Sequence, residues 1–100
     1  MDEYNVKILS PAQLDILDLV DNLNTMPPET AIQYYDQLTE QIGALTTSPE
    51  SYPLARDTQF RLRGYRTMQF NDYTVFFAIR GRNVEIRRVL YSKKQYERLY

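Results

Sequence analysis

The second half of this 100-residue chain gathers the side chains that could bind negative charge. Residues 51–100 contain eleven lysines and arginines but four aspartates and glutamates, a net charge of +7. Tyrosines are interleaved with these bases, and this mixture is typical of nucleic-acid-binding surfaces. The interleaved tyrosines are Tyr65, Tyr73, Tyr91, Tyr96 and Tyr100. The pattern therefore favours an anionic partner or target.

The first half has the opposite character. Residues 1–50 contain one lysine and nine acidic residues, so the whole chain has a net charge of −1. Two interpretations stay open. Either one part of the surface meets an anion, or the arginines of the second half pair with carboxylates of the first and the two halves neutralise each other in the fold.

The missing residue types argue against several classes of enzyme. The chain has no cysteine and no histidine, which argues against disulfides, a thiolate nucleophile, a serine–histidine hydrolase and a zinc enzyme. We expect neither a metal nor a cofactor. The N-terminus is acidic and no long apolar run follows it, so we expect no signal peptide, no membrane span and a cytoplasmic protein.

One domain must position these side chains, because 100 residues leave no room for a second core. Alternating hydrophobicity predicts a first strand over residues 4–9. Helical spacing predicts one helix from residue 10 to about 23 and another from about 28 to 46, joined as an antiparallel hairpin by a short proline turn. Residues 47–59 have no clear period and predict a loop.

The last forty residues predict a sheet. Strand-like runs cover residues 62–70, 73–80 and 84–91, and turn sequences separate them. A short helix is expected to begin at Ser92 and reach Tyr100. The order β-α-α-β-β-β-α describes an α+β fold in which a helical hairpin packs on a small antiparallel sheet.

Local patterns make finer predictions. Ser10 is predicted to cap the first helix, with Pro11 as the first helical residue and Gln13 closing a capping box. The acidic residues of this helix are expected to face solvent; they are Asp15, Asp18 and Asp21. Alternation assigns one face of the middle strand to Tyr73, Val75, Phe77 and Ile79. It assigns one face of the last strand to Val84, Ile86, Arg88 and Leu90.

Three segments of the chain resemble the RelE/ParE superfamily of bacterial toxins. The first is the strand at residues 4–10 leading into Pro11-Ala12, and the second is the helix that carries Ala31, Leu38, Ile42 and Leu45 ahead of Pro49. The third comprises Leu62-Arg63-Gly64-Tyr65-Arg66, the strand at residues 72–79 and Val84 to Tyr91. This third block is similar to the family's arginine-bearing strand, its Tyr-x-Val-x-Tyr/Phe strand and its Arg-Val-Leu-His/Tyr strand. The match spans essentially the whole chain.

The resemblance implies a growth-inhibiting toxin of a type II toxin–antitoxin module, of the kind that stabilises plasmids. RelE-like members cut mRNA in the ribosomal A site, whereas ParE-like members poison DNA gyrase. The first alternative, a ribosome-dependent mRNA endonuclease (mRNA interferase), ranks slightly ahead on the sequence. The second is a gyrase inhibitor without catalytic groups, and the third is a non-toxic chain that keeps only its antitoxin-binding role. Fold alone does not choose among them.

For the endonuclease, the resemblance implies a catalytic set of Arg66, Lys94 and Tyr100. Metal-independent RNA cleavage needs a base, an acid and cations that stabilise the phosphorane. Where RelE-like toxins carry an arginine on the third strand, this chain has Thr74. Arg66 is a poor base because a guanidinium stays protonated, so Lys94 or Glu85 would have to serve.

Five further bases complete the expected RNA-binding or target-binding surface: Arg63, Arg87, Arg88, Lys93 and Arg98. The partners implied are a cognate antitoxin and either the ribosome with its mRNA or DNA gyrase. We hypothesise that the antitoxin covers exposed apolar surface and supplies carboxylates to the region of Arg63, Arg66, Arg88 and Lys94. Raising the salt concentration should then loosen the complex.

Overall fold

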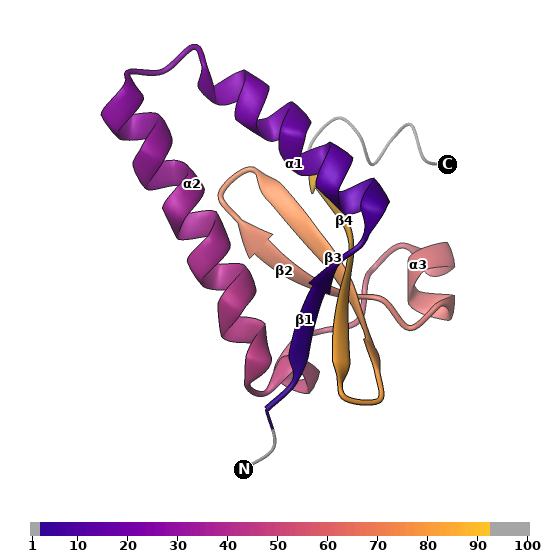
Figure 1. The fold of residues 1–100 in the computed structure, drawn as a ribbon. Helices are drawn as coiled ribbons and strands as arrows, with labels where there is room; N and C mark the ends of the chain where they lie inside the picture. The colour runs from indigo at the N-terminus through magenta and orange to yellow at the C-terminus, as the bar shows by residue number, and fades with distance from the viewer. Residues whose placement is uncertain (1–2, 93–100) are drawn as a thin grey trace.

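A computed structural model of the protein describes residues 3–92. A first strand leads into two long helices, and a short third helix and three further strands follow along the chain; Figure 1 shows how these elements are arranged. The strands are β1 Asn5–Ile8, β2 Arg66–Phe70, β3 Tyr73–Arg80 and β4 Asn83–Tyr91. The α-helices are α1 Ser10–Leu23, α2 Pro28–Gly43 and α3 Thr58–Leu62, with 3₁₀ turns η1 Ala44–Thr46 and η2 Pro49–Ser51. The predicted α+β class is confirmed.

The strands form one sheet in the order β1-β4-β3-β2. β2 pairs with β3 and β3 with β4 in antiparallel fashion, as predicted, but β1 runs parallel to β4. The prediction of a wholly antiparallel sheet was therefore wrong at this edge. Alternation in residues 4–9 shows that they form a strand, but it does not encode strand direction, which is set by the long helical connection between β1 and β4.

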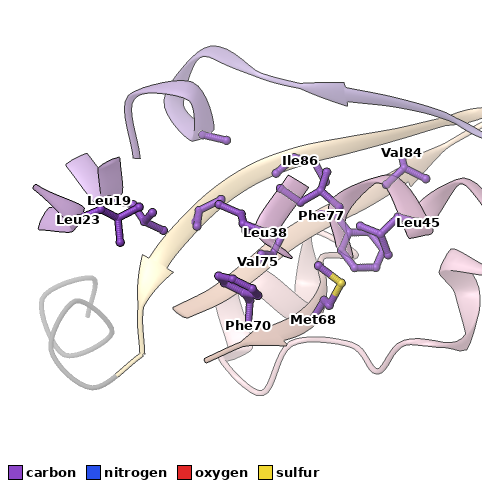
Figure 2. Packing of buried hydrophobic residues seen from close by; sticks show 13 residues of the cluster. Leu19, Leu23, Leu38, Leu45, Met68, Phe70, Val75, Phe77, Val84 and Ile86 are labelled. Carbon is purple, nitrogen blue, oxygen red and sulfur yellow. The ribbon is translucent and has the colours of Figure 1, made fainter. Parts of the chain in front are cut away.

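The main hydrophobic core lies between the sheet and the two long helices. Figure 2 shows Leu38 of α2, Leu45 of η1 and Leu19 and Leu23 of α1 around side chains that project from one sheet face. The sheet contributes Met68, Phe70, Val75, Phe77, Val84, Ile86 and Val89. Burying each large side chain contributes about 1.5–3 kcal/mol to folding. The prediction that Tyr73, Val75, Phe77 and Ile79 share one face of β3 is confirmed, because Val75 and Phe77 are buried in this core and Tyr73 and Ile79 pack against it.

A smaller core covers the opposite face of the sheet. It contains Ala55, Tyr65, Phe76, Ala78 and Leu90, with Phe60 of α3 packed against them. Sequence analysis predicted a loop up to residue 59 and a strand from residue 62, and both bounds were wrong. The side chain of Asp57 caps α3 by accepting from the Phe60 amide at 3.0 Å. Gly64, with φ of +79°, then turns the chain into β2.

A β-bulge changes the face assignment of β4. The register pairs Phe76 with Arg88 and Phe77 with Ile86, so Arg87 is an extra residue without a partner on β3. Val84 and Ile86 share a face as predicted, and this face points into the main core, but Val89 joins them there and Leu90 points into the smaller core. The expectation that Val84, Ile86, Arg88 and Leu90 share a face was therefore wrong.

The helix ends also differ from the predictions. Ser10 is the first residue of α1 and makes no cap, because Leu9 occupies the N-cap position. Gln13 donates instead to the carbonyl of Ile8 at 2.9 Å, so the predicted capping box does not form. The second helix is α-helical to Gly43 and continues as the 3₁₀ turn Ala44–Thr46. Within residues 3–92, no helix is long and apolar enough to cross a membrane.

Candidate functional site

A small hollow beside α3 collects three of the arginines that were predicted to bind a target. Its volume is about 230 Å³. It is lined by Leu9, Pro11, Phe60, Arg63, Tyr65, Arg87 and Arg88. These residues come from the start of α1, from α3 and the turn after it, and from the bulged part of β4. We call this site the cationic hollow.

Aromatic rings form one side of the cationic hollow. The rings of Phe60 and Tyr65 stack with their centroids 5.5 Å apart, and Phe60 meets Phe76 of the smaller core edge-on at 4.7 Å. The guanidinium carbon of Arg87 lies 5.6 Å from the centre of the Tyr65 ring, within the range of a cation–π interaction. The hollow therefore offers an anion positive charge beside flat apolar surface.

The three arginines differ in how firmly they are held. Arg63 lies on the exposed surface after α3. Arg87 forms a salt bridge with Glu85, and its Nε is buried without a hydrogen-bond partner among residues 3–92. A buried donor left in this state lowers stability unless an acceptor reaches it.

Arg88 is held by a carboxylate of α1. Its Nε and Nη2 donate to the two oxygens of Asp15 at 2.7 and 3.1 Å, and the amide of Val89 donates to Asp15 at 2.9 Å. The hydrogen bond to Asp15 raises the pKa of Arg88, while burial opposes the rise. Because the folded-state pKa is raised, this contribution to stability is fully present below the ordinary arginine value, which covers the whole range in which the protein is handled.

Asp15 also completes the edge of the sheet. β1 pairs with β4 as far as Ile86, and the amide of Leu9 donates to the Ile86 carbonyl at 3.0 Å. Beyond that point α1 has left the sheet, and the Asp15 carboxylate takes the strand's place as acceptor for Val89. The side chain of Asp15 is 11% exposed, so the expectation of a solvated face fails at this residue, although Asp18 and Asp21 are exposed.

A larger cleft lies on the other side of the Asp15–Arg88 ion pair, between α1, α2 and the ends of β3 and β4. Its volume is about 970 Å³, and the residues from 3 to 92 that line it include three aspartates and three tyrosines but no lysine or arginine. The lining is Asp15, Asp18, Leu19, Asn22, Leu23, Met26, Tyr34, Gln37, Asn71, Asp72, Tyr73, Val89 and Tyr91. We call it the acidic cleft. The sequence did not predict this cleft, although Asp15, Asp18 and Asn22 follow one another at helical spacing.

The tyrosines of the acidic cleft pack against its walls. Tyr73 and Tyr91 meet edge-on with their centroids 5.5 Å apart, and the Asn22 side chain donates to the Tyr73 hydroxyl at 3.4 Å. Tyr34 meets Phe70 of the main core at 5.1 Å. Burial raises the pKa of Tyr34, and the negative charge of Asp72 adds to the rise while a hydrogen bond with Asn71 opposes it.

The structure places two other predicted site positions away from the cationic hollow. Arg66 lies on the helix-covered face of β2 and donates to the carbonyl of Tyr52 at 2.6 Å. Thr74, which is 3% exposed, is hydrogen-bonded to Gln69 at 3.1 Å and to Ser92 at 2.9 Å. Thr74 therefore forms a closed polar cluster at the end of the sheet.

The remaining predicted site residues lie outside the described residues. These are Lys93, Lys94, Arg98 and Tyr100, together with the helix predicted from Ser92 onward. The carboxylate of Glu85, an alternative base, is engaged by Arg87. Over residues 3–92 no cluster of three acidic side chains is arranged to hold a metal ion. The cationic hollow can therefore bind an anion, but its described lining supplies cations and rings without a proton-transferring pair.

Comparisons with known proteins give a consistent result. Residues 6–96 match the family model described as the ParE toxin of the type II toxin–antitoxin system, parDE. A chain of the solved chromosomal ParDE system from P. aeruginosa is similar in fold, with a TM-score of 0.73 and 18% identity over 89% of this chain and 96% of that chain. A chain of the toxin–antitoxin complex RelBE2 from Mycobacterium tuberculosis gives a TM-score of 0.57 and 23% identity over 91% and 93%. No curated protein matches the sequence.

Proposed function

This chain belongs to the family of ParE toxins of type II toxin–antitoxin systems, and we propose that it stops growth by binding DNA gyrase rather than by cutting mRNA. The family model covers most of the chain. The proposal takes the second of the two alternatives that the sequence left open, because the described residues favour binding over catalysis.

The composition of the cationic hollow carries this proposal. Arg63, Arg87 and Arg88 line the hollow together with the stacked rings of Phe60 and Tyr65. Such a surface can hold an acidic or phosphate-bearing partner by charge and by contact with the rings. Proton transfer at a ribose needs a base and an acid near the same phosphate, and three guanidiniums supply neither.

The positions of Arg66 and Thr74 also support a role without catalysis. Arg66 is on the sheet face opposite the cationic hollow, with its guanidinium bonded to the Tyr52 carbonyl. Thr74 stands where RelE-like toxins carry an arginine, and its hydroxyl is committed to Gln69 and Ser92. Two of the positions that RNA cleavage would use thus serve the fold of this chain.

We further propose that an antitoxin holds the toxin inactive by covering the cationic hollow with carboxylates. Two similar solved structures are a ParDE toxin–antitoxin system and a RelBE2 toxin–antitoxin complex. An acidic segment would neutralise Arg63, which is exposed, and the partly exposed side chain of Arg87. The complex should then weaken as salt rises, because exposed charge pairs are screened within about 10 Å at 0.1 M salt.

The test compares two purified reactions with the same protein. We expect the toxin to inhibit DNA supercoiling by gyrase and to leave mRNA intact in a translating ribosome reaction. Arg63→Glu should lose inhibition, whereas the control Arg56→Glu, an exposed arginine outside the cationic hollow, should keep it. Both variants should unfold at the same urea concentration as the parent.

Other outcomes would overturn this proposal in distinct ways. Cleavage of mRNA that requires ribosomes and disappears in Lys94→Ala and Tyr100→Phe would establish the endonuclease instead. The absence of any growth defect when the chain is induced without antitoxin would favour the non-toxic alternative.

A further inference from the structure

The acidic cleft carries negative charge, which the acidic antitoxin segment proposed above would not neutralise. Its volume is about 970 Å³, against about 230 Å³ for the cationic hollow, and none of the described residues that line it is a lysine or arginine. An acidic antitoxin segment suits the cationic hollow, but it would be repelled here. The occupant of this cleft should therefore be cationic, with apolar groups to meet Leu19, Leu23 and Met26.

Two of the three aspartates that line the cleft are available for such an occupant. Asp15 is engaged by Arg88 and by the Val89 amide. The carboxylates of Asp18 and Asp72 make no ion pair or side-chain hydrogen bond with any other residue in the range 3–92. Asp72 raises the pKa of the neighbouring Tyr34, as an unneutralised negative charge would.

The chain itself supplies a segment of matching character where β4 ends. Tyr91 lines the acidic cleft, and the segment that follows Ser92 contains Lys93, Lys94 and Arg98 against one acidic residue, Glu97. The same segment contains Tyr96, Leu99 and Tyr100, which could meet the apolar and aromatic lining. We propose that residues 93–100 dock in the acidic cleft and pair their cations with Asp18 and Asp72.

The start of this segment is fixed beside the cleft. The amide of Ser92 donates to the carbonyl of Asp72 at 2.7 Å, and its hydroxyl is held by Thr74 at 2.9 Å and by Gln69 at 3.0 Å. Eight residues beyond Ser92 span roughly 26 Å when extended and roughly 12 Å as a helix. Because the segment is tethered beside the cleft, its effective concentration there is high.

Disulfide trapping can test this docking, because the chain contains no cysteine of its own. A cysteine at Gln95 is paired with one at Asn22 or Gln37, which line the two helical walls of the cleft. The matched control pairs Gln95→Cys with Thr39→Cys, an exposed position of α2 outside the cleft. Each rate is normalised to the reactivity of the single cysteines with a small thiol reagent. We expect crosslinking within one chain to be roughly tenfold faster for at least one cleft pair than for the control.

Charge variants then test what holds the segment. Asp18→Asn combined with Asp72→Asn should slow crosslinking at the faster cleft pair by roughly three- to tenfold, the effect of losing two partly exposed ion pairs. The matched control is Asp36→Asn with Glu40→Gln, two exposed acidic residues of α2 outside the cleft, and it should leave the rate unchanged. Urea unfolding of each variant shows whether the fold is retained.

Three results would overturn the proposal. The first is an equal normalised crosslinking rate at the cleft and control positions. The second is that disulfides form only between chains. The third is a crosslinking rate at the cleft that stays the same when Asp18 and Asp72 are replaced. Crosslinking is measured on the toxin alone, without gyrase, ribosomes or antitoxin. Its failure is therefore distinct from a failure of the proposed target, which the supercoiling and mRNA reactions measure.

Discussion

The cationic hollow and the acidic cleft are linked by one ion pair but differ in charge and size. Arg88 lines the cationic hollow, Asp15 lines the acidic cleft, and the two side chains are bonded to each other. The hollow has three arginines in about 230 Å³, and the cleft has three aspartates in about 970 Å³. The ion pair therefore joins an acidic residue of the first half to a basic residue of the second half. A negatively charged surface and a positively charged surface both remain available.

This comparison refines both interpretations that the sequence left open. Asp15 and Arg88 come from different halves of the chain and neutralise each other, as the second interpretation expects. Arg63 and Asp18 remain exposed on opposite sides of that pair, as the first expects. One ion pair between the two halves of the chain thus leaves two surfaces that can recognise partners of different charge.

Breaking the ion pair between Asp15 and Arg88 should have the largest effect, and this effect is on the free energy of unfolding. Asp15→Ala leaves Arg88 and the Val89 amide without their acceptor, so we expect the free energy of unfolding to fall by about 2–4 kcal/mol. Urea unfolding followed by circular dichroism measures the change. Asp18→Ala, one turn along the same helix and exposed, is the control and should change stability by less than about 0.5 kcal/mol. Equal effects at the two positions would show that Asp15 has no such role.

Reversing a charge in the cationic hollow should have a smaller effect, on binding rather than folding. Arg63→Glu should weaken binding of the antitoxin by about tenfold and should make the remaining affinity less sensitive to salt. Isothermal titration at two salt concentrations measures both. Arg56→Glu makes the same change of charge outside the hollow and should preserve the salt dependence. An unchanged affinity in Arg63→Glu would place the antitoxin elsewhere.

Removing a hydrogen bond at the end of the sheet beside the acidic cleft should lower the free energy of unfolding by a smaller amount. Thr74→Val keeps the shape of the side chain but removes the hydroxyl that Gln69 and Ser92 share, so we expect a loss of about 1 kcal/mol. Urea unfolding gives the value. Thr67→Val, which changes a half-buried threonine of β2 with no side-chain hydrogen bond to any residue from 3 to 92, is the control. A loss no greater than in the control would contradict the role of the cluster.

The smallest effect concerns pH and the acidic cleft. Because burial raises the pKa of Tyr34 above the ordinary value of about 10, its contribution to stability is fully present below that value. It is lost as the pH rises through the folded-state pKa. Tyr34→Phe should therefore flatten the decline in stability above that pH, whereas Tyr35→Phe should keep it. Urea midpoints measured from neutral to alkaline pH provide the check.

Hydrophobic periodicity predicted the long elements well. The strand expected over residues 73–80 is β3, and the expected shared face of four residues is confirmed by the main core. Periodicity failed where chain direction or an extra residue decides the structure. The parallel pairing of β1 and the bulge at Arg87 leave no mark on hydropathy, because Arg87 and Arg88 are both polar.

The candidate site was predictable in part. Arg63, Arg87 and Arg88 were named from the sequence, and the structure brings them together. Arg66 is on the opposite face, and a signal for this existed, because Met68 and Phe70 follow it at alternate positions of the same strand. The acidic cleft could not be found in the same way. Its wall combines Asp18 of α1 with Asp72 and Tyr91, which come together only after the sheet has formed.

The bulge in β4 has a consequence for sequence change in this chain. Arg87 is the extra residue of the bulge and shifts the alternation of β4 by one position. Even-numbered residues before it, such as Ile86, and odd-numbered residues after it, such as Val89, therefore point into the same core. Deleting this single position would leave a regular ladder in which Arg88 still pairs with Phe76 and Val89 with Val75, so the downstream residues would keep their faces. A loss of one codon here should therefore remove the bulge and the Arg87–Glu85 ion pair while retaining the Arg88–Asp15 contact.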